Sequence, residues 1–281
     1  MPAKIIVTHI FPDLDAICSV WLLVKFEADL KEAKIEFVPA GKTYKNQTVD
    51  SDPTIIHVDT GLGRFDHHQT NERTCAAELV FNYLKREKKI SLKYQSAVER
   101  LVEIVIQADQ FEDFFWEDSG NDRYEFFLQY LLENLKLSGN LNDTELVYQG
   151  MALLNGILFG FRQKIKSEEE IEKGEEFETK WGKSLAVESQ LMFDIKLAHK
   201  MGYRLVVRKE PETGFVSIKS QPKKELDLTE AYRALKGADA KADWFFHKSK
   251  HIISNGSRHN PQVKPSKLSL EEIKEVLRNL S

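Results

Sequence analysis

Two short apolar runs near the N-terminus each lead directly into acidic residues and histidine. Residues 5–9 read Ile-Ile-Val-Thr-His and are followed by Asp13 and Asp15, while residues 55–58 read Ile-Ile-His-Val and are followed by Asp59. Short apolar runs of this kind indicate buried strands, and open α/β folds place their functional sites at the carboxyl ends of parallel strands. The pattern therefore predicts a parallel sheet with Asp and His gathered along one edge.

A third cluster of the same residue types, Asp66-His67-His68, follows shortly after Asp59. Carboxylates that lie close together repel one another and lose solvation unless a cation compensates them. A site for metal ions is the simplest interpretation of these clusters. Each residue alone has an ordinary explanation, because Asp13 or Asp15 could cap the following helix and a single histidine is often a core residue.

Composition limits the class of protein only broadly. The chain has 281 residues and a formal net charge of −4, which predicts no general attraction to nucleic acid or acidic membranes. No apolar run approaches the length of a membrane span, and no signal segment is seen, so we expect a cytoplasmic protein without a membrane partner. Cys18 and Cys75 lie within apolar helical patterns, which favours buried free thiols over a disulfide.

The order of the expected elements predicts an α/β fold with two domains. An N-terminal parallel-sheet domain over 1–160 alternates strands with helices and then becomes mostly helical. The charge-rich segment 161–195 is interpreted as a helical linker, either a connecting helix or a solvated surface helix. A smaller C-terminal α/β domain over 196–281 contains two alternating segments, 203–208 and 214–219, and a closing helix whose first turn has a capping box.

The acidic and histidine clusters form four motifs in a defined order. They are His9-x-x-x-Asp13-x-Asp15 after a strand, Asp59 after a second strand, Asp66-His67-His68, and Asp109 after a helical segment. In order and spacing these motifs resemble the DHH phosphoesterase superfamily. That superfamily includes manganese-dependent pyrophosphatases, exopolyphosphatases, RecJ-type exonucleases, nanoRNA phosphatases and cyclic-dinucleotide phosphodiesterases.

The resemblance implies a centre with two divalent metal ions, and mixed imidazole and carboxylate ligands favour Mn²⁺. Four carboxylates contribute a charge of about −4, which two divalent ions cancel. The resemblance implies that His9, Asp13 and Asp59 hold the first ion and that Asp15, Asp59, His67 and Asp109 hold the second.

Four further side chains near these motifs are candidates for other roles. Asp66 is expected to orient an imidazole, and His68 to contact the substrate phosphate or protonate the leaving oxygen. His57 shares a strand face with Asp59, and either a place at the site or a structural role fits it. Arg73 is either a phosphate contact or a surface arginine.

The loop after residue 254 reads Asn-Gly-Ser-Arg-His and is the second informative region. Gly256 permits a tight turn, and Arg258 and His259 could contact substrate phosphate. By position and chemistry the loop resembles the substrate-binding loop of the DHH-associated domain, although it lacks the Gly-Gly-Gly-His sequence of nanoRNA and cyclic-dinucleotide enzymes. A polar hairpin loop without ligands is the alternative.

Other C-terminal residues carry weaker signals. Four lysines could add to a basic face, and three adjacent aromatics could stack bases unless they form a core strand. The lysines are Lys219, Lys223, Lys224 and Lys264, and the aromatics are Trp244, Phe245 and Phe246. His199 and His247 are interpreted as structural.

These observations together predict metal-dependent hydrolysis of a phosphoester or phosphoanhydride. The expected partner is a small phosphorylated substrate, such as a nucleotide or polyphosphate, or a short nucleic-acid end, and the chain could form a homodimer. The alternative is a regulatory protein that keeps the fold and binds a nucleotide or phosphate without turnover. Loss of activity usually removes a ligand, whereas every expected ligand position is filled here. A RecJ-like processive nuclease would need further domains, for which we expect no room in 281 residues.

Overall fold

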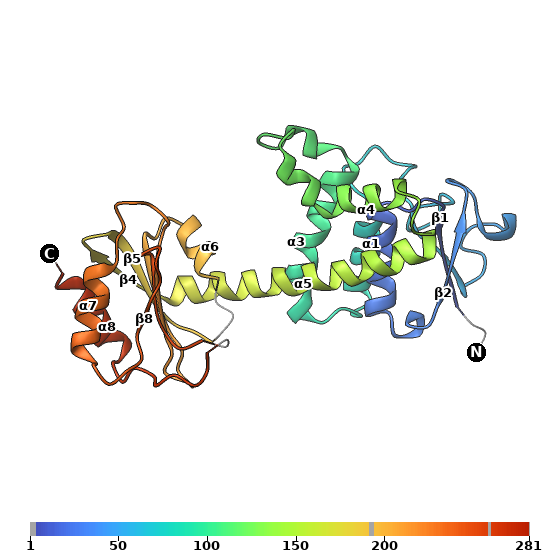
Figure 1. Ribbon diagram of the computed structural model, residues 1–281. Helices are drawn as coiled ribbons and strands as arrows, with labels where there is room; N and C mark the ends of the chain where they lie inside the picture. The colour runs from blue at the N-terminus through green and yellow to red at the C-terminus, as the bar shows by residue number, and fades with distance from the viewer. Residues whose placement is uncertain (1–3, 191–193, 258–259, 281) are drawn as a thin grey trace. The chain divides into compact units, whose positions relative to one another are not determined.

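A computed structural model describes residues 4–190, 194–257 and 260–280 of the chain (Figure 1). Contacts between residues divide the chain into two compact units, Met1–Arg162 and Gln163–Ser281. The two units are described separately. None of the helices in the described ranges combines the length and the apolar character that a membrane crossing requires.

The sheet of the first unit contains three parallel strands in the order β2-β1-β3. Their bounds are β1 Ile5–His9, β2 Lys34–Val38 and β3 Ile55–His57. In register, His9 lies opposite Val38 and Val7 lies opposite His57. The central strand β1 and its neighbour β3 therefore end at the same edge, and the α/β class with a parallel N-terminal sheet is confirmed.

Helices make up most of the rest of the first unit. Their bounds are α1 Leu14–Phe26, α2 Ala76–Arg86, α3 Leu92–Asp109, α4 Leu128–Leu137 and α5 Asp143–Lys173, with short 3-10 helices η1 Ala28–Leu30, η2 Tyr44–Asn46, η3 Glu112–Phe115 and η4 Asp122–Phe126. Helix α1 is buried along most of its length because its apolar residues cover more than one face; Ile17 and Leu22 are fully buried. It packs against α2 and α3, so its N-terminus is fixed next to the sheet edge.

The second unit is built on a mixed sheet in the order β4-β5-β6-β7-β9-β8. Its strands are β4 Glu175–Thr179, β5 Gly182–Glu188, β6 Leu205–Lys209, β7 Val216–Ser220, β8 Phe245–Phe246 and β9 Ile252–Asn255, and its helices are α6 Ile195–Lys200, α7 Thr229–Ala238 and α8 Leu270–Arg278. Strands β5 and β6 are parallel and the other neighbours are antiparallel. The two alternating segments predicted over 203–208 and 214–219 form the antiparallel strands β6 and β7.

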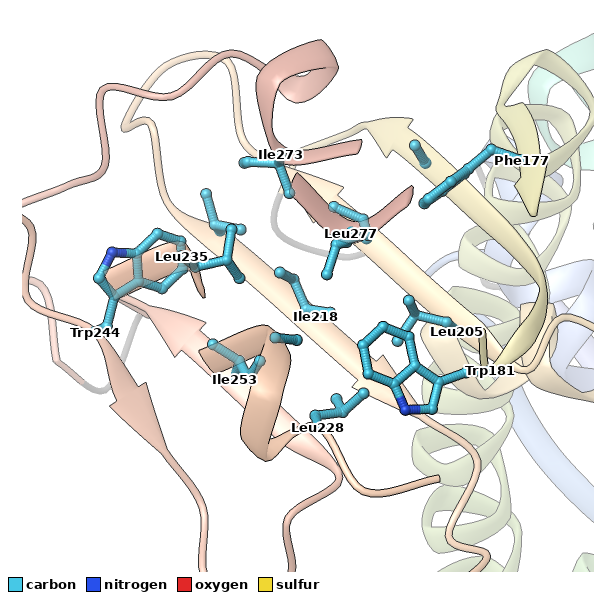
Figure 2. Packing of buried hydrophobic residues seen from close by; sticks show 14 of the residues in the cluster. Phe177, Trp181, Leu205, Ile218, Leu228, Leu235, Trp244, Ile253, Ile273 and Leu277 are labelled. Atoms are coloured by element: carbon cyan, nitrogen blue, oxygen red, sulfur yellow. The ribbon is translucent and has the colours of Figure 1, made fainter. Parts of the chain in front are cut away.

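One face of this sheet packs against α7 and α8 and forms the core of the unit (Figure 2). Leu205 and Ile218 point from the sheet towards Leu235 and Leu277 of the two helices. The capping box predicted for the closing helix is present, because the Ser269 hydroxyl accepts a hydrogen bond from the Glu272 backbone N–H and the Glu272 carboxylate accepts one from the Ser269 backbone N–H.

The prediction of a helical linker over 161–195 is wrong for its second half. Helix α5 ends at Lys173, and the following residues form the hairpin β4–β5. Strand β4 lies at the sheet edge, and of its residues only Phe177 is buried. An edge strand with one buried residue shows no alternation that separates it from a solvated helix. The two cysteines agree with expectation, since Cys18 and Cys75 are both buried free thiols.

Candidate metal centre

The side chains of the first two motifs converge at the carboxyl edge of the β1–β3 sheet. His9 is the last residue of β1, Asp59 follows β3, and Asp13 and Asp15 lie at the start of α1. His67 comes from the loop before α2, and Asp109 is the last residue of α3. Their ligand atoms form two groups, each within 4.8 Å, that could hold a metal ion: His9, Asp13 and Asp59, and Asp15, His67 and Asp109. Asp59 and His67 form a third group of this kind with His68.

Asp59 lies at the middle of the cluster and is 4% exposed. Its Oδ2 lies 3.2 Å from Nε2 of His9, and its Oδ1 lies 3.6 Å from Nε2 of His67. The backbone of Asp59 is left-handed, with φ of 53°, a conformation that is uncommon outside glycine and typical of strained functional positions. Asp59 Oδ1 is buried and has no hydrogen-bond partner among the described residues, so it can accept a cation.

The ring of His9 is oriented for ligation. Its Nδ1 lies 2.9 Å from the backbone oxygen of Ile10, so Nδ1 carries a proton and Nε2 faces Asp59. The protonated Nε2 donates a hydrogen bond to Asp59, and the deprotonated Nε2 has a lone pair available for a cation. Burial opposes protonation of this ring, but the bond to Asp59 and the charge of Asp13 raise the pKa of His9 to about 9. Without a metal ion, a proton compensates the carboxylates at this position.

His67 occupies the equivalent position in the second group. Its Nε2 lies 3.6 Å from Asp59 Oδ1 and 3.7 Å from an oxygen of both Asp15 and Asp109, beyond hydrogen-bond length for each. The interaction with Asp59 raises the pKa of His67 to about 9, against the effect of burial and with help from Asp109 and Asp15. One buried imidazole nitrogen surrounded by three carboxylates at these distances leaves room for a cation between them.

Asp15 has two structural functions at once. Its carboxylate accepts hydrogen bonds from the backbone N–H groups of Ala76 and Ala77, both 2.7 Å long, at the N-terminus of α2. Burial and the charges of Asp59 and Asp13 raise its pKa well above the usual range. A carboxylate has lone pairs for both the helix and a cation, so the cap on α2 does not exclude a ligand role for Asp15. Asp13 likewise caps α1 through Ala16.

These observations fit the group that the motifs imply. The buried atoms Asp59 Oδ1 and His67 Nε2 have no hydrogen-bond partner among the described residues, and the carboxylates around them crowd negative charge. Mixed nitrogen and oxygen donors suit Mn²⁺, Fe²⁺, Co²⁺ or Zn²⁺ better than Ca²⁺. The first unit therefore contains a candidate centre for divalent cations.

Asp66 and His68 lie beside this cluster. Asp66 Oδ1 lies 2.8 Å from Nδ1 of His68, and its Oδ2 accepts a hydrogen bond from the backbone N–H of Leu62. The His68 ring is 59% exposed and lies 4.4 Å from the His67 ring, measured between centroids. Asp66 is thus buried and anchors an imidazole that extends from the cluster into solvent.

Arg73 and His57 have partners within the protein. The Arg73 guanidinium forms ion pairs with Glu103 and Glu112. His57 Nε2 accepts a hydrogen bond from the backbone N–H of Tyr44, and burial lowers the pKa of the ring, which keeps it neutral. We therefore include neither side chain in the candidate centre.

In the second unit the aromatic and histidine candidates are mostly structural. Trp244 is buried in the core, and Phe246 stacks on Tyr232 with ring centroids 5.0 Å apart. His199 Nδ1 lies 2.9 Å from the backbone oxygen of Tyr203. Phe245 is exposed. Arg258 and His259 lie outside the described residues.

A cavity of about 440 Å³ next to the cluster was not expected from the sequence. Three carboxylates of the cluster, those of Asp13, Asp15 and Asp109, line this cavity. The rest of its lining comes mainly from the segment between α3 and α5. The sequence feature that indicates this cavity is the dense run of aromatic residues from Phe111 to Trp116. The run lies in the region for which the sequence predicts only helices.

Comparisons with known proteins give matches at the level of structure alone. No family model and no curated protein sequence matches the chain. The fold matches the pGpG-specific phosphodiesterase PggH from Vibrio cholerae at 13% identity and a TM-score of 0.30, over 91% of this chain and 92% of that one. It also matches RecJ from Thermus thermophilus, solved with Mg²⁺, at 13% identity and a TM-score of 0.34, over 98% of this chain and 49% of that one.

A third match is an exopolyphosphatase-related protein from Bacteroides fragilis, at 14% identity and a TM-score of 0.28, over 98% of this chain and 90% of that one. Similarities of this size carry no argument about what the chain does. The functional assignment below rests on the four motifs and on the geometry of the cluster.

Proposed function

We propose that the chain is a phosphohydrolase of the DHH type that uses two divalent cations, with Mn²⁺ as the physiological metal. The observation that supports this most strongly is Asp59, whose two carboxylate oxygens contact His9 on one side and His67 on the other. This arrangement suits a ligand shared between two ions, with His9 and Asp13 completing one site and Asp15, His67 and Asp109 the other.

The bound ions would supply positive charge at the substrate phosphate and lower the pKa of an attacking water. Side chains of the protein orient the substrate contact and fix the ligands in place. The Asp66 carboxylate is hydrogen-bonded to Nδ1 of His68 and so presents the exposed imidazole to substrate. Asp15 is held rigidly by α2, which keeps its oxygens in place beside His67.

The second unit offers a candidate surface for phosphate. Arg208 on β6 lies opposite Ser217 on β7, which in turn lies opposite Ser254 on β9. By strand alternation these residues and Lys219 occupy the sheet face opposite the core in Figure 2. Burial lowers the pKa of Lys219 most, and the charges of Arg208 and Lys196 add to this effect.

The test is release of phosphate or nucleotide from a panel of substrates by metal-stripped protein to which Mn²⁺ is added back. The panel contains pyrophosphate, polyphosphate, linear and cyclic dinucleotides, and short RNA. We expect turnover of at least one class, loss of turnover in Asp59→Asn, and unchanged turnover in Asp122→Asn, which removes an exposed carboxylate elsewhere in the same unit. Tight Mn²⁺ binding without turnover of any substrate would contradict the proposal and favour a regulatory binding protein.

A further inference from the structure

The cavity beside the metal centre is lined in part by aromatic side chains, which is unusual for a site that binds only phosphate. Apart from the cluster carboxylates, its lining includes the aromatic residues Phe111, Phe114 and Tyr130. Phe111 and Phe114 are each 65% exposed, and their ring centroids lie 5.7 Å apart. Large apolar rings exposed at the mouth of a cavity typically mark a binding site for a ligand with apolar or aromatic surface.

The backbone holds Phe111 in an unfavourable conformation. Its φ is 55°, in the left-handed region that bulky residues rarely adopt, and it follows the ligand Asp109 by two residues at the end of α3. Non-glycine residues in this region cluster at functional sites, where the surrounding structure maintains them. The turn brings an exposed aromatic ring to the cavity directly after a carboxylate of the centre.

A hydrogen-bond network orients a further aromatic side chain of the lining, Tyr130. The Tyr130 hydroxyl and the Gln129 amide both donate to Oδ2 of Asp113, at 2.5 and 3.0 Å, and Asp113 is 5% exposed. This bond and burial raise the pKa of Tyr130 to about 12, so the hydroxyl stays protonated. The Tyr130 side chain is therefore anchored by a buried carboxylate.

The charge of the lining disfavours a long polyanion in this cavity. Lys136 is the single cationic side chain among the described residues that line it, whereas Asp113 and Glu133 add negative charge beyond the cluster. Lys136 Nζ donates a hydrogen bond to the backbone oxygen of Phe11, 2.7 Å away. Burial raises the pKa of Asp13, and the charge of Lys136 opposes that rise, so Lys136 lies near the centre. A single cation next to the metal ligands suits a ligand with one phosphate. The aromatic side chains beyond it suit an uncharged ring system joined to that phosphate.

We propose that this cavity is a nucleobase subsite and that the substrate is a nucleotide ester or short oligonucleotide, not inorganic polyphosphate. The proposal rests on the phosphohydrolase function above and assigns its substrate class. The scissile phosphate lies at the metal centre, Lys136 contacts its oxygens or those of the adjoining linkage, and the base stacks on Phe111 and Phe114. Stacking on aromatic side chains tolerates any base, so the subsite selects nucleic acid without selecting sequence.

The test compares Phe111→Ala and Phe114→Ala with the matched control Phe115→Ala. Phe115 belongs to the same 3-10 helix and is 89% exposed, but it does not line the cavity. Base stacking contributes enough that its loss weakens binding roughly 5- to 150-fold. We expect at least a tenfold increase in KM for a 5′-phosphorylated dinucleotide in the first two variants, less than twofold in the control, and recovery in Phe111→Tyr.

Binding of a fluorescent dinucleotide, followed by anisotropy in Mn²⁺ buffer, gives a second readout that needs no turnover. Weaker binding by Phe111→Ala and Phe114→Ala than by wild type and Phe115→Ala would support the subsite. This result would stand even if no substrate were hydrolysed and the proposed hydrolase activity were refuted. Equal binding by wild type and both cavity variants would overturn the subsite. Hydrolysis of polyphosphate without hydrolysis of dinucleotides would also overturn the nucleobase subsite. The proposed phosphohydrolase function would still hold in that case. If the variants sedimented differently from wild type but bound nucleotide equally well, we would conclude that Phe111 and Phe114 form a contact between copies of the chain.

Discussion

Replacing Asp109 by asparagine should change stability in opposite directions with and without metal. Oxygens of Asp109 and Asp15 lie within 4.8 Å of each other. Two unit charges at that separation repel by about 3 kcal/mol at an effective dielectric constant of about 20. Burial raises the pKa of Asp109 and, with neighbouring charges, that of Asp15, so proton uptake already relieves part of this repulsion. At pH 8 the protonated His67, with a pKa of about 9, attracts Asp109 and offsets this repulsion. We therefore expect Asp109→Asn to stabilise the metal-free first unit by about 1–2 kcal/mol only well above that pKa, at about pH 10, where His67 is neutral.

With metal the order should reverse. An ion present at a hundredfold excess over its dissociation constant stabilises the folded state by about 2.7 kcal/mol. For a unit of this size that corresponds to an increase in Tm of roughly 5–10 °C. The asparagine variant loses a ligand and should show little of this increase. Asparagine still offers an oxygen to the Gln110 amide, which in the wild type donates to Asp109, so the substitution leaves no donor unpaired.

The assay is thermal unfolding in EDTA and in MnCl₂, combined with hydrogen exchange of α1 and α3 so that the first unit is observed separately from the second. Asp122→Asn serves as the control for removing one negative charge at an exposed position. The reasoning would be refuted if Asp109→Asn were less stable than wild type in EDTA at the pH where His67 is neutral, or if it kept the full Mn²⁺-induced increase in Tm.

Three further predictions concern the exposed histidine, a glycine turn and an acidic group. His68→Gln should lower kcat about 10²- to 10⁴-fold while the Mn²⁺-induced increase in Tm persists, as steady-state kinetics and calorimetry would show. Gly256→Ala should destabilise the second unit by about 2–4 kcal/mol in urea unfolding, because φ is +87° and the added Cβ would lie 2.2 Å from the Phe215 ring. Hydrogen bonds from Lys250 and Thr229 lower the pKa of Asp227 to about 2. Its contribution is therefore complete above about pH 4 and lost as pH falls towards 2, so Asp227→Asn and wild type should converge in stability over that interval.

The sequence predicted the His9 and Asp59 part of the candidate cluster because strand geometry alone brings these two residues together. His9 and Asp59 follow neighbouring parallel strands, and the carboxyl ends of such strands meet at one edge. Local pattern could not reveal that Asp15 also caps α2, because that contact joins residues 61 and 62 positions apart. It depends on how α1 packs against α2.

Aromatic residues and charge runs were the weakest signals. Phe111 and Phe114 fit a helical region equally well as core residues, and only the turn after α3 shows that they are exposed. The segment with Glu175 and Lys183 carries charges at a spacing that a solvated helix and an edge hairpin share, so its strands β4 and β5 were missed. In both cases burial decides the structure, and burial depends on distant parts of the chain.

The bonds from Ala76 and Ala77 to Asp15 make two backbone amides into spectroscopic reporters of the candidate metal centre. Each amide proton points at a carboxylate oxygen whose electron density changes when a cation replaces a proton beside it. Their ¹H and ¹⁵N chemical shifts should therefore move on titration with a diamagnetic ion such as Zn²⁺. Occupancy of the centre could then be followed from the main chain of α2, without a substrate and without labelling any ligand side chain.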